Sequence, residues 1–190
     1  MNDQELREIP FSSETIYDGA ILRVEKWQVT CPNGHAAPRE IVVHKGAAAV
    51  IPVYEDGTTL LVRQHRVSVD RVTLEIPAGK LDSWGEDPYD CAVRELKEET
   101  GLTVENPKLC GVKQFPIDGG RYLVFFFKTD RFMGDLCSSK EGKMEWISRE
   151  ALPYLNTVSD FMDMLKVFDR DDLTEFQYVV DGDNWNVILK

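Results

Sequence analysis

Short extended runs separated by turn sequences fill the first half of the chain, and they precede one helix whose two ends are sharply marked. Residues 21–31 and 37–45 flank a Pro-Asn-Gly turn, and Asn-Gly between two extended runs predicts a β-hairpin. We predict a second hairpin from residues 47–54 and 59–66, joined by a Glu-Asp-Gly-Thr turn. The pattern therefore predicts antiparallel strands ahead of the first long helix.

That helix is predicted over residues 88–100, because Asp87 can cap it, Pro88 suits its first turn and Gly101 can end it. The other predicted elements are strands at 72–76, 108–115, 121–129 and 144–147, helices at 148–155 and 159–169 capped by Ser148 and Ser159, and a hairpin of 176–180 with 185–189. We expect an α+β fold with an N-terminal strand extension over residues 1–46, a central domain over 47–170, and a C-terminal hairpin over 171–190 packed on that domain.

Charge and hydropathy narrow the classes of partner. The 22 Lys and Arg residues against 33 Asp and Glu residues give a net charge of −11, which disfavours binding to nucleic acid or anionic lipid. The longest apolar run, residues 47–54, is far shorter than the roughly 20 residues of a membrane helix, so no membrane partner is expected. The first ten residues lack a secretory leader and the 4 cysteines form no CxxC pair, so we expect a cytoplasmic protein with reduced thiols.

The acidic stretch around the predicted helix carries the clearest chemical signal. Helical spacing places Glu95 and Glu99 one above the other with Glu98 beside them, and Arg94 lies four residues before Glu98. Like charges four residues apart destabilise an isolated helix, so the cluster favours a bound cation over a merely solvated face. Mg²⁺ prefers oxygen ligands and is commonly held by a few carboxylates together with substrate phosphates.

The same stretch resembles the Nudix box, whose consensus is G-x5-E-x7-R-E-U-x-E-E-x-G-U with U aliphatic. One extra residue separates Gly79 from Glu86, within the loop before the helix. The resemblance implies a Nudix fold, in which helices flank a mixed sheet and a loop-helix-loop motif cleaves nucleoside diphosphates linked to another group. The matching positions are Gly79, Glu86, Arg94, Glu95, Leu96, Glu98, Glu99, Gly101 and Leu102.

The resemblance also implies roles for individual residues. Glu95, Glu98, Glu99 and the main-chain carbonyl of Ala78 would bind Mg²⁺, which Mn²⁺ could replace. One of the glutamates or a ligand-bound water would activate the nucleophile, and the sequence leaves open which. The remaining roles are structural: Arg94 and Glu86 would pair to hold the glutamates, and Gly79 and Gly101 would support the motif.

Outside the box, the two halves of the chain resemble different branches of the family. Residues 39–47, 62–66 and 74–79 resemble the ADP-ribose pyrophosphatases, a branch in which N-terminal strands form a dimer and help to bind adenosine. This implies that Arg66 contacts substrate. Arg63, expected on the same strand face, could meet phosphate, and Trp27 could stack on adenine or simply pack in the core or at a dimer contact; these are the predicted substrate-binding residues.

The C-terminal third instead resembles MutT-type nucleoside triphosphatases. A Lys-Glu-Gly segment at residues 140–142 precedes Glu-Trp-Ile at 145–147, which makes Glu141 the candidate remote metal ligand or catalytic base, with Asp118 or Glu145 as alternatives. We therefore predict a Mg²⁺-dependent Nudix pyrophosphohydrolase that forms a homodimer and converts ADP-ribose or a related nucleoside diphosphate sugar to AMP and a sugar phosphate. The alternatives are a MutT-type hydrolase of normal or oxidised nucleoside triphosphates and a non-catalytic nucleotide sensor.

Overall fold

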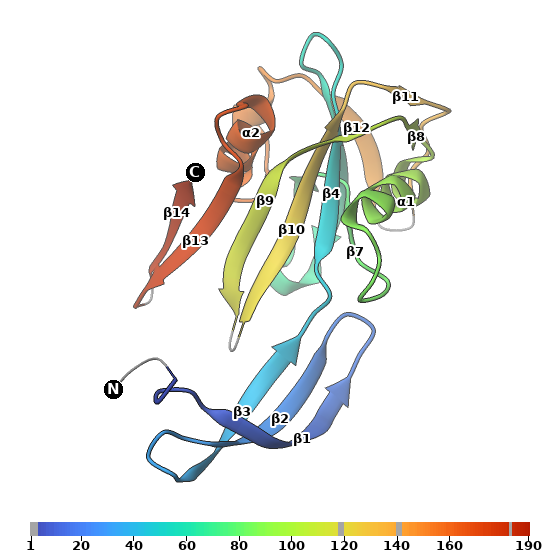
Figure 1. The fold of residues 1–190 in the computed structure, drawn as a ribbon. Coiled ribbons are helices and arrows are strands. Elements are labelled where there is room, and N and C mark those ends of the chain that lie inside the picture. Colours follow the sequence, from blue (N-terminus) through green and yellow to red (C-terminus); the bar gives the residue numbers. More distant parts are fainter. Residues whose placement is uncertain (1–3, 118–119, 140–141, 183) are drawn as a thin grey trace. The chain divides into compact units, whose positions relative to one another are not determined.

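A computed structural model describes residues 4–117, 120–139, 142–182 and 184–190 (Figure 1). The chain divides into two compact units, one of residues 1–45 with 116–122 and one of residues 46–115 with 123–190. This division falls next to the boundary expected at residue 46, but it also assigns residues 116–122 to the N-terminal unit.

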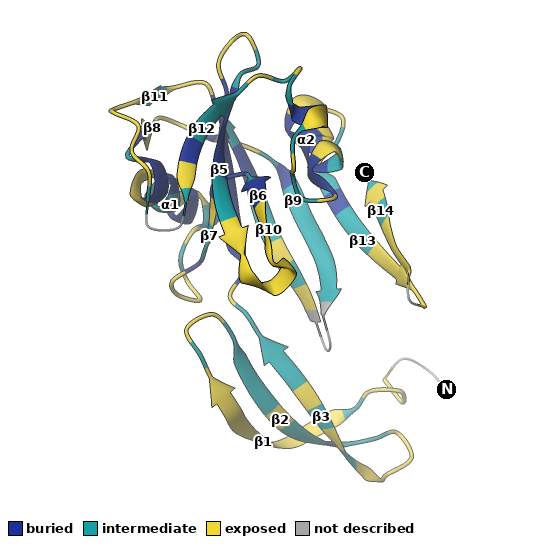
Figure 2. Cartoon of the chain, turned by 180° about the vertical axis from the view of Figure 1, so that it is seen from behind, coloured by how far each residue is buried: buried dark blue, intermediate teal, exposed yellow. Residues whose placement is uncertain are grey.

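The N-terminal unit is built on an antiparallel sheet of three strands in the order β1-β2-β3. The predicted hairpin is confirmed, because β2 and β3 pair in register around a turn in which Gly34 adopts a φ of 83°. Every residue of β1 is exposed (Figure 2). The strands are β1 (Ile9–Asp18), β2 (Arg23–Thr30) and β3 (Ala36–Val43).

The larger unit is organised by a mixed sheet of six strands in the order β14-β13-β9-β10-β4-β7 (Figure 1). Strand β4 is parallel to β10 and antiparallel to β7, and β13 is parallel to β9 and antiparallel to β14. The predicted C-terminal hairpin is therefore present, and it extends the central sheet. The strands are β4 (Ala47–Pro52), β7 (Ala78–Lys80), β9 (Lys108–Ile117), β10 (Gly120–Thr129), β13 (Glu175–Asp181) and β14 (Asn184–Leu189).

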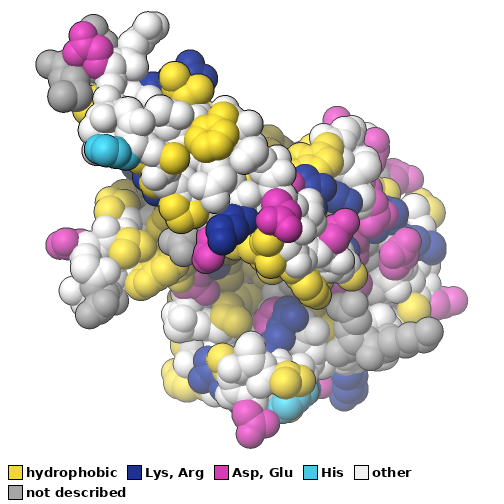
Figure 3. Space-filling view, turned by 90° about the horizontal axis from the view of Figure 1, so that it is seen from below, with side chains coloured by type: hydrophobic (Ala, Val, Ile, Leu, Met, Phe, Trp, Pro, Cys, Tyr) yellow, Lys and Arg dark blue, Asp and Glu magenta, His cyan; other side chains and the backbone are white. Residues whose placement is uncertain are grey.

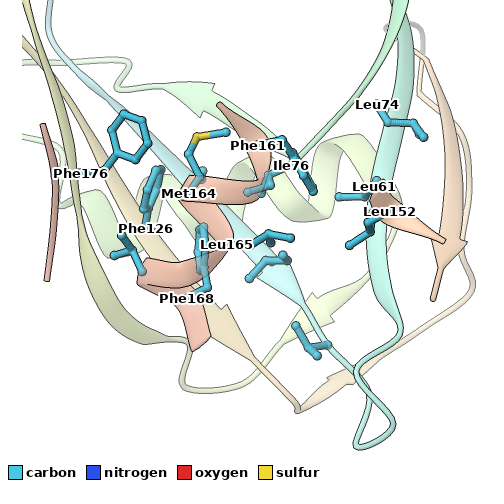
Figure 4. Packing of buried hydrophobic residues seen from close by; sticks show 14 residues of the cluster. Leu61, Leu74, Ile76, Phe126, Leu152, Phe161, Met164, Leu165, Phe168 and Phe176 are labelled. Carbon is cyan, nitrogen blue, oxygen red and sulfur yellow. The ribbon is translucent and has the colours of Figure 1, made fainter. Parts of the chain in front are cut away.

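Strand β4 is buried on both faces because the two helices cover opposite sides of the sheet. Its side chains alternate in direction, as in any strand. Ala49 and Ile51 belong to the core cluster that contains α2 (Phe161–Asp169), whereas Ala48 and Val50 belong to the cluster that contains α1 (Pro88–Thr100). The first cluster is shown in Figure 4, where the rings of Phe126 and Phe168 stack with centroids 4.6 Å apart.

The predicted hairpin of residues 47–54 with 59–66 is wrong. Strand β4 is buried at all six positions and pairs on both edges within the central sheet, which leaves no edge for β5. Strand β5 instead lies between β12 and β6, and only the bridge between Val53 and Thr59 joins the two runs. The remaining strands are β5 (Thr59–Arg66), β6 (Arg71–Glu75), β12 (Lys143–Ile147), and the pair β8 (Thr103–Val104) and β11 (Phe132–Met133).

The first helix has the predicted bounds. The Asp87 side chain accepts a hydrogen bond from the Tyr89 amide at 2.8 Å, and Gly101 ends the helix with a φ of 78°. The helix predicted at residues 148–155 is wrong, since only a 3₁₀ turn (Leu152–Tyr154) forms there and Pro153 cannot donate a helical hydrogen bond. Another 3₁₀ turn covers Val67–Val69.

The second helix begins later than predicted. Asp160, not Ser159, occupies its N-cap position, and the Asp160 side chain makes no cap hydrogen bond because its carboxylate accepts from Lys113 and Tyr178 instead. Neither helix of the described residues has the length and apolar character needed to cross a membrane.

Candidate active site

The start of the motif is held at the edge of the central sheet, where β7 pairs with β4. Gly79 lies directly against the carboxylate of Glu95. A Cβ atom at position 79 would stand 1.8 Å from the Glu95 Cδ atom and 2.1 Å from its Oε2 atom. In this arrangement a Cβ atom at position 79 would displace the Glu95 carboxylate, so the motif glycine lets that side chain lie against the loop backbone.

Arg94 joins the loop to the helix. Its guanidinium donates to Glu86 Oε1 at 3.1 Å from Nε and 3.0 Å from Nη2, to Glu95 Oε1 at 2.7 Å, and to the Lys80 carbonyl at 3.3 Å. The other Glu86 oxygen accepts from the Asp82 amide at 2.6 Å. The expected pair of Arg94 and Glu86 is therefore present, and the extra residue in the loop does not prevent it.

The three glutamates of the helix lie in different environments. Glu99 is buried, with 7% of its surface exposed, whereas 64% of the Glu98 side chain is exposed and its Oε2 lies 3.8 Å from Arg94 Nη1. Burial raises the pKa of Glu95, the bonds from Arg94 oppose this shift, and the charge of Glu98 adds to it. Burial thus disfavours the ionised form of Glu95, and a cation bound beside its carboxylate would stabilise that form.

The carboxylates do not stand in a finished coordination shell. Among the described residues, no three His, Cys, Asp or Glu side chains are arranged so that they could hold a metal ion. The Glu95 carboxylate is directed to Arg94. Binding of a cation by these glutamates would therefore require their side chains to rearrange.

The two strand arginines have different partners. Arg63 donates to both oxygens of Glu145 on β12, at 3.1 and 3.0 Å, and these bonds lower the pKa of Glu145. Arg66 donates to both oxygens of Glu75 on β6, at 2.8 and 2.5 Å. The expectation of a shared face was wrong, because an offset of three residues reverses the direction of a strand side chain.

Hydrogen bonds and burial act in opposite directions on the pKa of Glu75. Burial raises its pKa, but the hydrogen bonds from Arg66 and Thr73 outweigh burial and lower the pKa overall. Glu75 therefore holds Arg66 in place at the end of β5.

Three of the remaining predicted residues lie in the N-terminal unit or outside the described residues. Trp27 lies on β2 in the N-terminal unit, where its indole nitrogen donates to Glu25 at 2.7 Å. Glu141 and Asp118 lie outside the described residues. Gly101 serves the motif by ending the helix with positive φ.

A cavity of about 380 Å³ opens beside the loop, and its lining includes residues that the sequence did not single out. Arg66, Glu75 and Ala78 line it together with Lys113 and Asp160, which form an ion pair. Lys113 and Asp160 are separated by 47 positions in the chain. No motif joins them, so only the paired strands and α2 reveal their contact.

The fold and the loop-helix geometry together define a class of protein that comparison with known proteins identifies. The model of the NUDIX domain matches residues 43–167. The chain belongs to the Nudix family, and the predicted α+β Nudix fold is confirmed. Nudix hydrolases generally depend on a divalent metal.

Named relatives and solved structures agree with this family. An ADP-ribose pyrophosphatase of Bacillus subtilis is 44% identical over 100 residues, which cover 53% of this chain and 54% of the relative. One of Mycobacterium tuberculosis is 44% identical over 91 residues, 48% of this chain and 44% of the relative. The chain thus matches about half the length of these curated relatives.

Among solved structures, the mutator MutT protein of Bacillus halodurans is 28% identical with a TM-score of 0.61, covering 74% of this chain and 95% of that one. An ADP compounds hydrolase also has a TM-score of 0.61 at 18% identity, covering 85% of this chain and 91% of that one, and shows likeness of fold alone.

Proposed function

We propose that this protein hydrolyses the diphosphate of ADP-ribose or a related nucleoside diphosphate sugar, with a divalent cation, to AMP and a sugar phosphate. The observation that carries the proposal is the Arg94 clamp, which holds Glu86 and Glu95 together above Gly79 in the motif of the family. The choice of substrate follows the relatives, two of which are named ADP-ribose pyrophosphatases.

The donor set fits a hard cation such as Mg²⁺, for which Mn²⁺ is the substitute. All the candidate ligands are oxygens: the Ala78 carbonyl and the carboxylates of Glu95, Glu98 and Glu99. The half-buried Glu95 carboxylate, whose pKa is raised by burial, lies where a positive charge would offset its desolvation. A bound divalent cation would lower the pKa of an attacking water and neutralise charge on the diphosphate.

The chain's own residues would prepare this site. Arg94 would orient Glu95 and, through Glu86, keep the loop against the helix. Arg66, held by Glu75 at the rim of the cavity, would contact a substrate phosphate when it exchanges its partner. Arg63 is the weaker candidate for that contact, because it does not line the cavity.

The second candidate function is hydrolysis of a nucleoside triphosphate, including oxidised purines. Its support is the likeness to the MutT protein of Bacillus halodurans, since the match extends over 95% of that protein at 28% identity. In this case Glu141 would act as the remote ligand or base. The variant Glu141→Gln should then lower kcat by about 10-fold to 10³-fold with little change in KM, since the interaction would be made chiefly in the transition state.

A panel of nucleotides assayed with Mg²⁺, with products separated by chromatography, tests these functions. AMP with ribose 5-phosphate supports the first proposal, and a monophosphate with pyrophosphate supports the second. Glu98→Gln tests that the activity belongs to this site, because it removes one carboxylate charge of the proposed ligand set with little change in volume, so turnover should fall. Nucleotide binding without turnover of any compound would refute both hydrolases and favour a sensor.

We also propose that the N-terminal unit mediates a homodimer. Large apolar side chains on β1 are exposed, among them Ile9, Phe11 and Ile16 at 57–61%. Apolar side chains stand among charged ones on the face drawn in Figure 3. An exposed strand with such side chains is a typical site of self-association.

Light scattering coupled to size exclusion tests the dimer. The expected mass at micromolar concentration is twice 21.7 kDa, and Phe11→Glu should return it to the monomer value. A wild-type mass of 21.7 kDa under these conditions would contradict the proposal.

A further inference from the structure

The C-terminal hairpin lies beyond the part of the chain that matches the NUDIX domain, which ends at residue 167. Its strands β13 and β14 add to the central sheet next to β9 (Figure 1). The hairpin is thus an element that the family motif does not account for. Its side chains lie beside a strand of the larger unit.

An aromatic row runs along this hairpin from the core to the surface. Phe176 is fully buried, Tyr178 is partly buried, and Trp185 is 54% exposed. The ring centroids of Phe176 and Tyr178 are 5.2 Å apart and those of Tyr178 and Trp185 are 5.5 Å apart, with both pairs edge to face. The Tyr178 ring therefore packs against the exposed indole of Trp185.

Two charged side chains stand at the base of this row. Lys113 on β9 lies 5.0 Å from the ring centroid of Phe176 and 5.6 Å from that of Tyr178, and it forms an ion pair with the buried Asp160. The Tyr178 hydroxyl donates to Asp160 Oδ2 at 2.8 Å. Both hydrogen bonds that the described residues give this carboxylate end on Oδ2, so Oδ1 keeps the capacity to accept a bond from a ligand.

Two cavities share lining residues next to the aromatic row. The cavity of about 380 Å³ begins at Ala78 and Arg66 beside the motif and is lined at its other side by Lys113 and Phe115. A second cavity, of about 350 Å³, is lined by Lys113 and Phe115 again and by Tyr178 and Trp185. The shared residues place the aromatic row next to the cavity that starts at the motif.

We propose that Trp185 and Tyr178 form a stacking site for the purine ring of a nucleotide, with Lys113 and Asp160 as the polar groups that contact the ring. The proposal rests on the proposed function in taking the phosphate end of the ligand to lie near Ala78.

The chemistry of the row favours a nucleobase over other occupants. The half-exposed indole offers a flat apolar face, with the phenol ring packed edge to face against it, and base stacking on such rings is tolerant of the kind of base. An ammonium group and a carboxylate oxygen at one edge supply a donor and an acceptor, which match the mixed edges of a purine. A sugar phosphate without a nucleobase would gain nothing from this surface.

The test measures binding and needs no turnover. Isothermal titration of AMP and of ribose 5-phosphate is carried out with the wild-type protein, Trp185→Ala and Trp185→Phe. Tyr154→Ala is the control, because Tyr154 is 88% exposed and lines neither cavity. Thermal melts check that each variant is folded, and the exposed position of Trp185 makes a loss of folding unexpected.

We expect Trp185→Ala to weaken AMP binding by roughly 5-fold to 100-fold, the range of a lost base-stacking contact. Trp185→Phe should stay within about threefold of wild type because it keeps a ring. Ribose 5-phosphate should bind all variants equally. Wild-type protein that does not bind AMP, or AMP affinity that Trp185→Ala leaves unchanged, would overturn the inference.

A variant at the other predicted stacking residue separates two placements of the ring. Loss of AMP affinity in Trp27→Ala but not in Trp185→Ala would place the ring on the N-terminal unit and overturn the inference. Hydrolysis is scored separately: turnover of ADP-ribose with AMP binding insensitive to Trp185 refutes the stacking site alone. AMP binding that depends on Trp185 without any turnover refutes the proposed function alone.

Discussion

Replacing Arg94 with alanine removes a side chain that bonds to both the loop and the helix of the motif. The change would leave Glu86 and Glu95 without their cation, and each has only 15–16% of its side chain exposed. Removing one partner of a buried ion pair costs about 3–5 kcal/mol. Because 27% of the Arg94 side chain is exposed and solvent screens part of the interaction, we expect a loss of about 2–3 kcal/mol.

The assay is thermal unfolding followed by circular dichroism at pH 7. For a chain of this size each kcal/mol lowers the midpoint by about 2–4 °C, so the Arg94→Ala midpoint should fall by roughly 4–12 °C. Arg94→Lys keeps the charge but lacks the planar guanidinium that binds Glu86, Glu95 and the Lys80 carbonyl together. Its midpoint should therefore lie between those of wild type and Arg94→Ala.

Arg170→Ala is the matched control. Arg170 donates to both oxygens of Asp172 at 3.0 and 2.5 Å, but both side chains are more than half exposed, so the Arg170→Ala midpoint should stay close to that of wild type. If the midpoint of Arg94→Ala matched that of Arg170→Ala, the loop would not depend on the clamp, and the reasoning would be refuted.

Three further predictions concern charge and protonation. Glu99→Gln should lower turnover roughly 10²-fold at saturating Mg²⁺ with an unchanged thermal midpoint, whereas near wild-type turnover would remove Glu99 from the ligand set. The lowered pKa of Glu75 means that its stabilisation is complete above the unfolded pKa of about 4.3 and is lost as the pH falls through the folded pKa. Urea unfolding should therefore separate wild type from Glu75→Gln at pH 7, and an equal separation at the lowest pH that keeps the fold would argue against the shift. Burial and then the charge of Glu86 raise the pKa of Cys91 to about 11, so Ellman's reagent at pH 8 should modify the exposed Cys137 and reach Cys91 only after unfolding.

The parts of the structure that the sequence predicts well are those decided by neighbours in the chain. The helix of residues 88–100 has its predicted ends because Asp87, Pro88 and Gly101 act on the backbone within one turn. The Arg94 clamp is similar, since its partners lie within fourteen positions on a loop and the helix that follows it. Local geometry and a family motif are sufficient for both.

The parts that the sequence predicts poorly depend on pairing between distant segments. The turn after β4 reverses the chain as predicted, but β4 pairs with β10 and β7 because only those strands complete a sheet with both of its faces covered. The cap of α2 also differs from prediction, because the Asp160 carboxylate is used by Lys113 and Tyr178. No local rule indicates such competition for a side chain.

This difference between local and distant contacts bears on how catalysis and substrate choice are divided in the molecule. The residues proposed to hold the cation come from one loop and one helix, so a change elsewhere in the fold leaves their order along the chain intact. The cavity beside Ala78 is lined in part by β9 and α2, and the second cavity, which shares Lys113 and Phe115 with it, is lined by a hairpin beyond the matched domain. We therefore expect substitutions in the helix to alter kcat for every nucleotide, and substitutions at Lys113 or Trp185 to alter KM in a manner that depends on the base. A panel of ADP-ribose and its analogues with other bases measures this directly. Equal changes in KM for all bases would show that the hairpin plays no part in recognition of the ring.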